Sequence, residues 1–356
     1  MTWNSPFAST VASPGKGEVV LSLLPPSIPT LETLTYKYPL KLLSRAVGFT
    51  PESSVLPPCA ATRPIHLYLL TYGGGLLPGD QIDVSITLHP RTRLVVTTPQ
   101  GSTKIFKTAS DDGRRAQRSK EKDDMSRQVL DVRIGSQAAL CYLPDPTAPF
   151  KDSRYEQIQR FTVDGDVMGN ERSSLCVLDW VTQGRTSRGE DWDFHFWKGK
   201  NEVWSVDGNG EKRRLLLRDS VILDDEMRPG VDVEEGEETN NNTLIRERTR
   251  PHGIVGTLIL YGPVFDHLAS FIMEAFTSQP RIGGRNWSSS ATDDRPPETK
   301  VQQYDVTWTA ARVRAGFVLV KFGAKDFETA RDWLGSIIRE EGSIIREFGE
   351  EALFCL

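Results

Sequence analysis

Short runs of alternating apolar and polar residues recur along most of the chain, separated by turns rich in Gly, Pro and Asn. The alternation has the two-residue period of half-buried β-strands. It predicts strands near residues 17–24, 31–38, 65–72, 81–88, 93–98, 129–134, 138–143, 155–163, 174–181, 192–197, 202–206, 215–223, 256–260, 304–312 and 316–322. So many short strands predict a mostly β protein.

Helical periodicity is confined to two segments in the C-terminal part. Apolar residues recur at helical spacing over residues 263–277, where Pro263 suits the first turn, and over residues 326–340. The tail repeats Gly-Ser-Ile-Ile-Arg-Glu at 335–340 and 342–347. This seven-residue spacing keeps the paired isoleucines on one helical stripe. It suits burial against a partner, and a helix lengthened by tandem duplication explains it as well.

The chain divides into three parts. Residues 1–16 are rich in Ser, Thr, Pro and Ala and are predicted to be disordered. Residues 17–323 are predicted to form one β domain, and residues 324–356 a C-terminal helix that carries the duplicated segment. Polar stretches near 109–127, 228–243 and 282–300 interrupt the β domain and have few apolar residues, so we interpret them as solvated insertions.

A glycine-rich segment at residues 72–80 stands between two apolar runs. Its glycines supply positive φ or close backbone approach, and Pro-Gly supplies a turn. The simplest interpretation is a hairpin that pairs residues 65–72 with 81–88. The glycines concerned are Gly73, Gly74, Gly75 and Gly79.

Two acids, Asp80 and Glu190, each follow a glycine and precede an apolar strand. Both share the parity of the apolar side chains, so both are expected to face inward, where a charge must be paired or bound to metal. Each could instead cap backbone N–H groups or pair with Arg185 or Lys104. Two inward carboxylates also suit glycoside chemistry, so the alternative is a β-structured hydrolase or lyase that uses them as an acid/base pair.

Composition narrows the function further. The 356 residues carry a net charge of -5, which argues against general nucleic-acid binding. No apolar run reaches membrane-spanning length and the N-terminus lacks a secretion signal, so we expect a cytoplasmic protein without a membrane partner. The chain has no nucleophile elbow, phosphate loop or His-Glu-x-x-His motif. The four cysteines and the five histidines are scattered along the chain and do not predict a closed zinc site. The cysteines are Cys59, Cys141, Cys176 and Cys355.

Four motifs together resemble the family of the urease accessory protein UreD, also called UreH. They are Tyr-Gly-Gly-Gly-Leu-Leu-Pro-Gly-Asp at 72–80, Thr-Thr-Pro-Gln-Gly-Ser-Thr-Lys-Ile-Phe-Lys at 97–107, Leu-Pro-Asp-Pro-Thr-Ala-Pro-Phe at 143–150 and Gly-Arg-Thr-Ser-Arg-Gly-Glu at 184–190. The likeness spans about residues 17–322. The insertions resemble those of fungal or other eukaryotic members. Pro99 and Asp145 depart from the family pattern, which often has Gln at the latter position.

The resemblance implies a stacked, β-helix-like arrangement of strands with two α-helices. It also implies a non-enzymatic maturation factor: a scaffold and metallochaperone that binds apo-urease, UreF and the GTPase UreG and assists nickel insertion. No cofactor would be tightly bound. Transient Ni²⁺ would pass inward carboxylates such as Asp80 and Glu190, because oxygen ligands release a divalent ion more readily than a Cys/His site. A further possibility is a scaffold that nickel never touches. The family motif also includes Gly189, Arg185 and Lys104.

Overall fold

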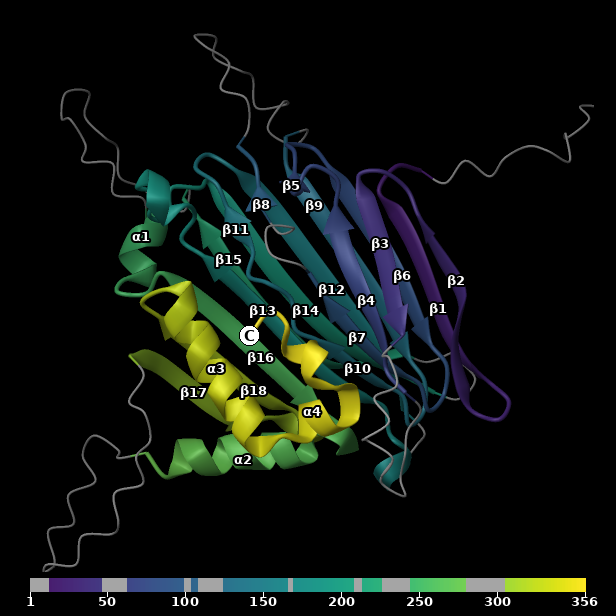
Figure 1. Ribbon diagram of the computed structural model, residues 1–356. Coiled ribbons are helices and arrows are strands. Elements are labelled where there is room, and N and C mark those ends of the chain that lie inside the picture. The colour runs from purple at the N-terminus through teal and green to yellow at the C-terminus, as the bar shows by residue number, and fades with distance from the viewer. Residues whose placement is uncertain are drawn as a thin grey trace, which may run out of the picture.

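Two large β-sheets and one small sheet make up most of the molecule (Figure 1). The computed structural model describes residues 13–46, 63–98, 104–107, 124–165, 169–207, 213–225, 244–279 and 305–356. Most residues of the three predicted insertions and of the predicted N-terminal end lie outside these ranges, and so do Cys59 and Pro99. The predicted mostly β class is confirmed, with helices in the C-terminal part.

The first large sheet has seven strands in the order β15-β14-β12-β9-β6-β1-β2. Its five inner strands run parallel to one another, and β2 and β15 pair antiparallel at the two edges. The strands are β1 (Lys16–Leu24), β2 (Ile28–Tyr36), β6 (Gln81–Leu88), β9 (Ser126–Ile134), β12 (Arg154–Asp164), β14 (Phe196–Val206) and β15 (Arg213–Asp224).

The second large sheet has eight strands in the order β17-β18-β16-β13-β10-β7-β4-β3. Strands β4, β7, β10 and β13 are parallel, and β17 and β18, both predicted as strands, pair antiparallel as a hairpin. The strands are β3 (Leu40–Ala46), β4 (Ile65–Thr71), β7 (Arg93–Thr97), β10 (Ala139–Tyr142), β13 (Ser174–Thr182), β16 (Ile254–Tyr261), β17 (Val306–Arg312) and β18 (Val318–Ala324).

A small parallel sheet connects the two large ones. It consists of β5 (Gly75–Leu76), β8 (Lys104–Ile105) and β11 (Ala148–Pro149). The chain passes from the eight-stranded sheet through the small sheet to the seven-stranded sheet three times, as β4-β5-β6, β7-β8-β9 and β10-β11-β12. The predicted hairpin of residues 65–72 with 81–88 is therefore wrong. The glycine-rich segment makes two corners with β5 between them, so β4 and β6 end in different sheets.

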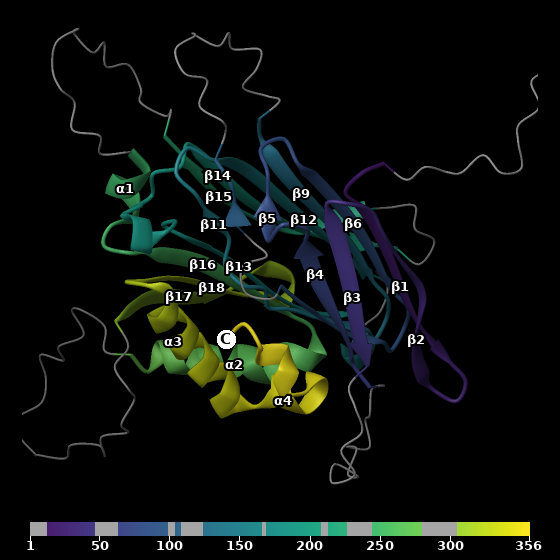
Figure 2. The same cartoon turned by 45° about the horizontal axis from the view of Figure 1, so that its top comes forward.

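Two apolar layers hold the sheets and helices together. An inter-sheet layer between the two large sheets contains Leu21, Phe161 and Trp197. A helix layer lies between the eight-stranded sheet and the helices, with Trp180 and Ile338 among its buried residues (Figure 2). Each large side chain buried in these layers favours folding by roughly 1.5–3 kcal/mol.

Both predicted helices are present, as α2 (Asp266–Thr277) and α3 (Phe327–Glu341), but the duplicated tail does not extend α3. Gly342, with φ of 79°, ends α3 in the left-handed conformation, and α4 (Ser343–Phe348) begins after it. Glycine adopts this conformation without the clash of a Cβ, so the repeat ends one helix and begins the next. Ile338 and Ile344 are fully buried in the helix layer.

The remaining helical elements are short. They are α1 (Leu244–Thr249), η1 (Gly169–Glu171), η2 (Thr186–Arg188), η3 (Pro263–Phe265), η4 (Arg314–Gly316) and η5 (Glu350–Leu353). Within the described residues, no helix combines the length and apolar character needed to cross a membrane.

Candidate functional site

The four sequence motifs occupy equivalent corners of successive passages of the chain. Strands β5, β8 and β11 lie in the first three motifs, and the fourth motif follows β13 where the chain crosses to β14. Parallel pairing places Gly75 and Ala148 on either side of Lys104. Segments more than a hundred residues apart thus form one stacked column, which we call the motif edge: residues 72–80, 104–107, 143–150 and 184–190.

The glycines of the first corner have the two roles predicted for them. Gly73 and Gly74 have φ of 83° and 76°, in the region that favours glycine. Gly75 allows close approach, because a Cβ there would lie 2.4 Å from the carbonyl oxygen of Lys104. Gly79 and Gly189 also have positive φ, of 81° and 74°. A side chain at Gly75 would therefore clash with β8, and glycine lets β5 lie against it.

Glu190 is buried at the fourth corner and is held by Arg185. Its side chain is 6% exposed. The Arg185 backbone N–H donates to Oε2 at 2.9 Å and its Nε donates to Oε1, also at 2.9 Å. The same guanidinium lies 3.8 Å from the centre of the Phe150 ring. Burial raises the pKa of Glu190, but the hydrogen bonds and charge of Arg185 outweigh it, so the pKa is lowered.

Asp80 lies at the first corner and caps a turn. Its Oδ2 accepts a hydrogen bond from the backbone N–H of Leu77 at 2.8 Å, and its carboxylate is partly exposed. The inward orientation expected from strand parity is not found, because β6 begins at Gln81 and the turn sets the direction of Asp80. Lys104 is exposed and forms no ion pair within the described residues.

The acid/base alternative receives no support from this geometry. Both Glu190 oxygens accept hydrogen bonds from Arg185, and the lowered pKa keeps the group ionised, whereas a general acid needs a raised pKa. Asp80, the proposed second member, is engaged in its own turn.

Buried polar residues that the sequence analysis did not select lie just inside the motif edge. Asp179 of β13 is 6% exposed and accepts hydrogen bonds from Gln157 Nε2 at 3.1 Å and Asn201 Nδ2 at 2.7 Å. Burial raises the pKa of Asp179 to about 6, although these two hydrogen bonds lower it. A signal was present in the sequence: a carboxylate within the apolar run of β13, at a position that faces the core.

Asp145 of the third corner is a second buried carboxylate. It is 6% exposed, and its backbone N–H donates to Thr98 Oγ1 at 2.8 Å. Burial raises its pKa to about 6, and a hydrogen bond with Cys355 partly opposes this. Its Oδ2 has no hydrogen-bond partner among the described residues. Buried polar atoms are normally satisfied, so such an atom points to a site for water or a ligand.

Asp179 lies between two cavities. One, of about 20 Å³, is nearly enclosed and has room for roughly one water. It is lined by Leu76 and Ile105 from the first two corners and by Asp145 from the third. The other, of about 260 Å³, opens near Lys321. We call Asp145, Gln157, Asp179 and Asn201 the interior polar cluster; it borders both cavities and begins at the motif edge.

No preformed metal site is found within the described residues, where no group of three or more His, Cys, Asp or Glu side chains comes together. The acids of the motif edge and the interior polar cluster therefore form no group of three or more ligands in the part of the chain that the structure describes. Oxygen ligands in that arrangement would hold a divalent ion only with the help of water or a partner protein.

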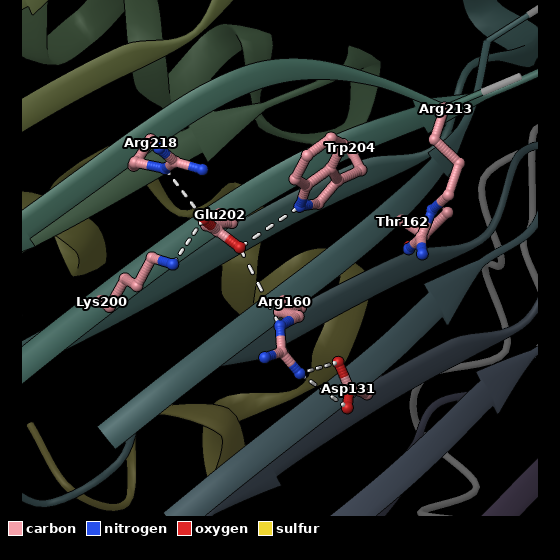
Figure 3. Close-up of polar contacts among 8 residues, drawn as sticks. All are labelled: Asp131, Arg160, Thr162, Lys200, Glu202, Trp204, Arg213 and Arg218. Carbon is pink, nitrogen blue, oxygen red and sulfur yellow. Dashed lines mark hydrogen bonds and ion pairs between the residues drawn. The ribbon is translucent and has the colours of Figure 1, made fainter. Parts of the chain in front are cut away.

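A second polar network covers the outer face of the seven-stranded sheet (Figure 3). Glu202 of β14 is almost buried there and pairs with Lys200 and Arg218, each at 2.8 Å. Burial raises its pKa, but hydrogen bonds and charge, first of all those of Lys200, outweigh this and lower it. Arg160 connects this group to Asp131 at 3.3 Å.

Comparison with known proteins decides the family. The family model described as UreD urease accessory protein matches residues 15–352. The chain belongs to the UreD family. The match includes the whole motif edge, the interior polar cluster and the outer face of the seven-stranded sheet, and it ends before Cys355.

Curated relatives agree with this assignment. A ureD-like urease accessory protein of Schizosaccharomyces pombe is 29% identical over 309 residues, covering 87% of this chain and 88% of the relative. Urease accessory protein 4 of Cryptococcus neoformans is 29% identical over 344 residues, covering 92% and 90%. Urease accessory protein D of Arabidopsis thaliana is 32% identical over 238 residues, covering 67% and 65%. This UreD-family chain thus has fungal and plant relatives.

Proposed function

We propose that this UreD-family chain is a urease maturation factor that binds apo-urease and the other accessory proteins and assists insertion of nickel into the urease active site. The observation that carries the proposal is the family match over residues 15–352, which includes all four motifs of the motif edge. The partners we propose are urease, a UreF-type accessory protein and a UreG-type GTPase. The protein acts as a scaffold and metallochaperone, not as a catalyst.

Nickel, as cargo, contacts the chain at the motif edge in this proposal. Asp80 is the outer contact, because its carboxylate is partly exposed and only Oδ2 is used in the turn. Glu190 is the inner contact, and nickel reaches it only when Arg185 swings away from its carboxylate. Release remains easy because each carboxylate acts alone.

The interior polar cluster extends the proposed route. Asp145 and Asp179 line the same small cavity, and Asp179 also borders the larger one near Lys321. A divalent cation beside these buried acids would offset their desolvation and favour their ionised forms. Carboxylates at successive points of such a route would offer the ion successive weak contacts.

The test uses a host that carries the cognate urease genes. Deleting the gene for this chain is expected to leave apo-urease protein present but without activity and nickel, and the wild-type gene is expected to restore both. Restoration with Asp80→Ala and Glu190→Gln together is expected to give much less nickel per urease. Asp332→Ala, an exposed acid on α3, is the matched control and should restore fully.

The outcomes separate two levels of the proposal. Full urease activity after deletion would overturn the maturation role. If deletion abolishes activity but the double variant restores it fully in limiting nickel, the protein is a scaffold that nickel does not touch at these acids. Thermal melts of the purified variants show whether a loss comes from unfolding.

A further inference from the structure

The outer face of the seven-stranded sheet, which points away from the inter-sheet layer, gathers basic side chains. Alternating residues of β9, β12 and β14 face outward there, while their neighbours are buried. Around Arg160 five bases accompany two acids, a local charge of +3 in a chain whose net charge is -5; farther along β12 the same face also carries Glu156, which pairs with Arg127 and Lys198, and Asp164. The bases are Arg133, Arg160, Lys200, Arg213 and Arg218, and the acids are Asp131 and Glu202. Figure 3 shows all of them except Arg133.

Both of the acids next to Arg160 are already neutralised. One cross-strand row places Asp131, Arg160, Glu202 and Arg218 on four successive strands, so the charges alternate. Arg160 contacts Asp131 at 3.3 Å and Glu202 at 3.9 Å, and Lys200 also pairs with Glu202. The excess positive charge therefore lies outside the row, at Arg133 and Arg213.

Arg133 and Arg213 are exposed and have no carboxylate partner within the described residues. Arg213 is nevertheless held in place: it donates to Thr162 Oγ1 at 3.2 Å and lies 5.7 Å from the centre of the Trp204 ring. An arginine that is oriented by neutral groups keeps its charge available, and less conformational entropy is lost when it binds an anion.

The two arginines line a cleft of about 430 Å³ together with Arg160, its ion-pair partner Asp131 and the hydroxyls of Ser85, Thr87 and Thr162. The lining residues come from β6, β9, β12 and β15. Arg213 reaches from β15 back to Thr162 of β12, so the guanidinium groups of Arg133, Arg160 and Arg213 gather over the neighbouring strands β9 and β12. Several guanidinium groups together suit the carboxylates of a protein segment.

Strand β15 adds apolar contacts and an open edge next to the cleft. It is the last strand of the sheet, and two of its outward residues are exposed: Leu215, two residues from Arg213, at 37%, and Ile222, about 30 Å farther along the strand from Arg213, at 50%. Exposed apolar side chains flanked by fixed charges are the usual composition of a protein interface, in which charge sets orientation and apolar burial adds affinity. A nucleic-acid backbone would leave these side chains without partners.

We propose that this outer face is the docking surface for an acidic segment of a partner protein. The inference rests on the proposed maturation function, since it places one partner of that assembly on this face. Carboxylates of the partner pair with Arg133 and Arg213, hydroxyls of the cleft donate further hydrogen bonds, and apolar side chains of the partner cover Leu215 and Ile222.

The test measures assembly of the full chain with the cognate apo-urease, UreF-type and UreG-type proteins, each added separately and then together. Arg133→Glu with Arg213→Glu is expected to weaken binding of one partner by at least about tenfold, because like charges would then face each other. Arg312→Glu with Arg314→Glu, two arginines at the far hairpin of the other large sheet, is the matched control. Raising the salt concentration should weaken wild-type binding more than binding of the double variant.

The outcomes are decisive and separate from those of the maturation test. The proposed docking surface is supported if only the cleft variant loses binding to a partner while its melting temperature is unchanged. Binding should then return when acidic residues of that partner are exchanged for lysine. Wild-type affinity of the cleft variant for every partner overturns it, while the deletion phenotype still tests maturation. Loss of binding to a poly(U) RNA probe without any loss of assembly would also overturn it, since the cleft would then be a nucleic-acid site.

Discussion

The helix layer and the inter-sheet layer differ in what they bury. In the helix layer, Phe265 stacks on Phe348 with ring centres 5.7 Å apart, and Trp333 contacts Trp308 and Phe322, each at 5.4 Å. The inter-sheet layer is equally apolar over most of its area but contains the interior polar cluster around Asp179 next to the motif edge.

The difference between the two layers indicates which part of the molecule serves stability and which serves function. Aromatic packing in the helix layer stabilises the fold and holds the C-terminal helices. A buried carboxylate with a raised pKa destabilises the folded protein at neutral pH, so its presence calls for another reason. We therefore assign the C-terminal helices to stability and the polar end of the inter-sheet layer to function. Four variants, ordered by expected effect, challenge this division.

Phe348→Ala is expected to have the largest effect. The side chain is fully buried in the helix layer, and its loss leaves a cavity, so the free energy of unfolding should fall by about 3–5 kcal/mol. Chemical denaturation measures the change. Phe354→Ala, at a residue 67% exposed in the same tail, should alter stability by less than about 0.5 kcal/mol. Equal effects of the two would mean that α4 contributes little to the helix layer.

Asp179→Asn is expected to change stability in a pH-dependent way. The folded pKa, about 6, is raised above the ordinary 3.8, so the stability associated with protonated Asp179 is present below about pH 4 and is lost as pH rises through 6. Relative to wild type, the variant should therefore gain roughly 3 kcal/mol between pH 4 and pH 7. Thermal and chemical unfolding of both proteins across this range measure the gain. A constant difference would contradict a desolvated acid at this position.

Glu190→Gln is expected to show the opposite sign. The folded pKa is lowered, so the ionised pair with Arg185 stabilises the protein above the ordinary value near 4.5 and ceases to do so as pH falls through the folded pKa. The variant should lose about 1–3 kcal/mol of unfolding free energy at pH 7, and the loss should disappear in acid. Thermal and chemical unfolding across the same pH range measure this loss. A loss that does not change with pH would contradict an ionised Glu190 paired with Arg185.

Asp131→Asn should have the smallest effect. Its carboxylate is 45% exposed and pairs with Arg160 on the outer face of the seven-stranded sheet. Exposed ion pairs contribute about 0–1 kcal/mol, so the melting temperature should barely move. A loss as large as that of Phe348→Ala would mean that the outer face contributes to the core stability assigned here to the helix layer.

Local patterns predicted much of the fold. Alternating apolar residues located most strands, and helical spacing located α2 and α3, because burial on one face imposes these periods directly. The pairing of strands was not predictable in the same way. A glycine-rich turn followed by an alternating strand looks the same whether the chain reverses within one sheet or crosses to another, so β4 and β6 were wrongly paired.

The site was predicted in part for a related reason. The burial of Glu190 and its pairing with Arg185 are confirmed, because both residues lie in one short corner. The direction of the Asp80 side chain is set by its hydrogen bond in the turn and not by the alternation of the following strand. Asp179, Gln157 and Asn201 come from three strands, and only the parallel register of β12 with β14 and the facing of the two sheets bring them together. Their proximity depends on the tertiary structure, so local sequence patterns could not predict it.

The most direct measurement of the central claim is nickel transferred to apo-urease in a reconstituted system of purified urease, UreF-type protein and nickel-loaded UreG-type GTPase, with and without this chain. Metal analysis of re-isolated urease gives nickel per active site. We predict efficient loading only when the wild-type chain is present and much weaker loading with Asp80→Ala/Glu190→Gln. Equal loading in its absence would contradict the account.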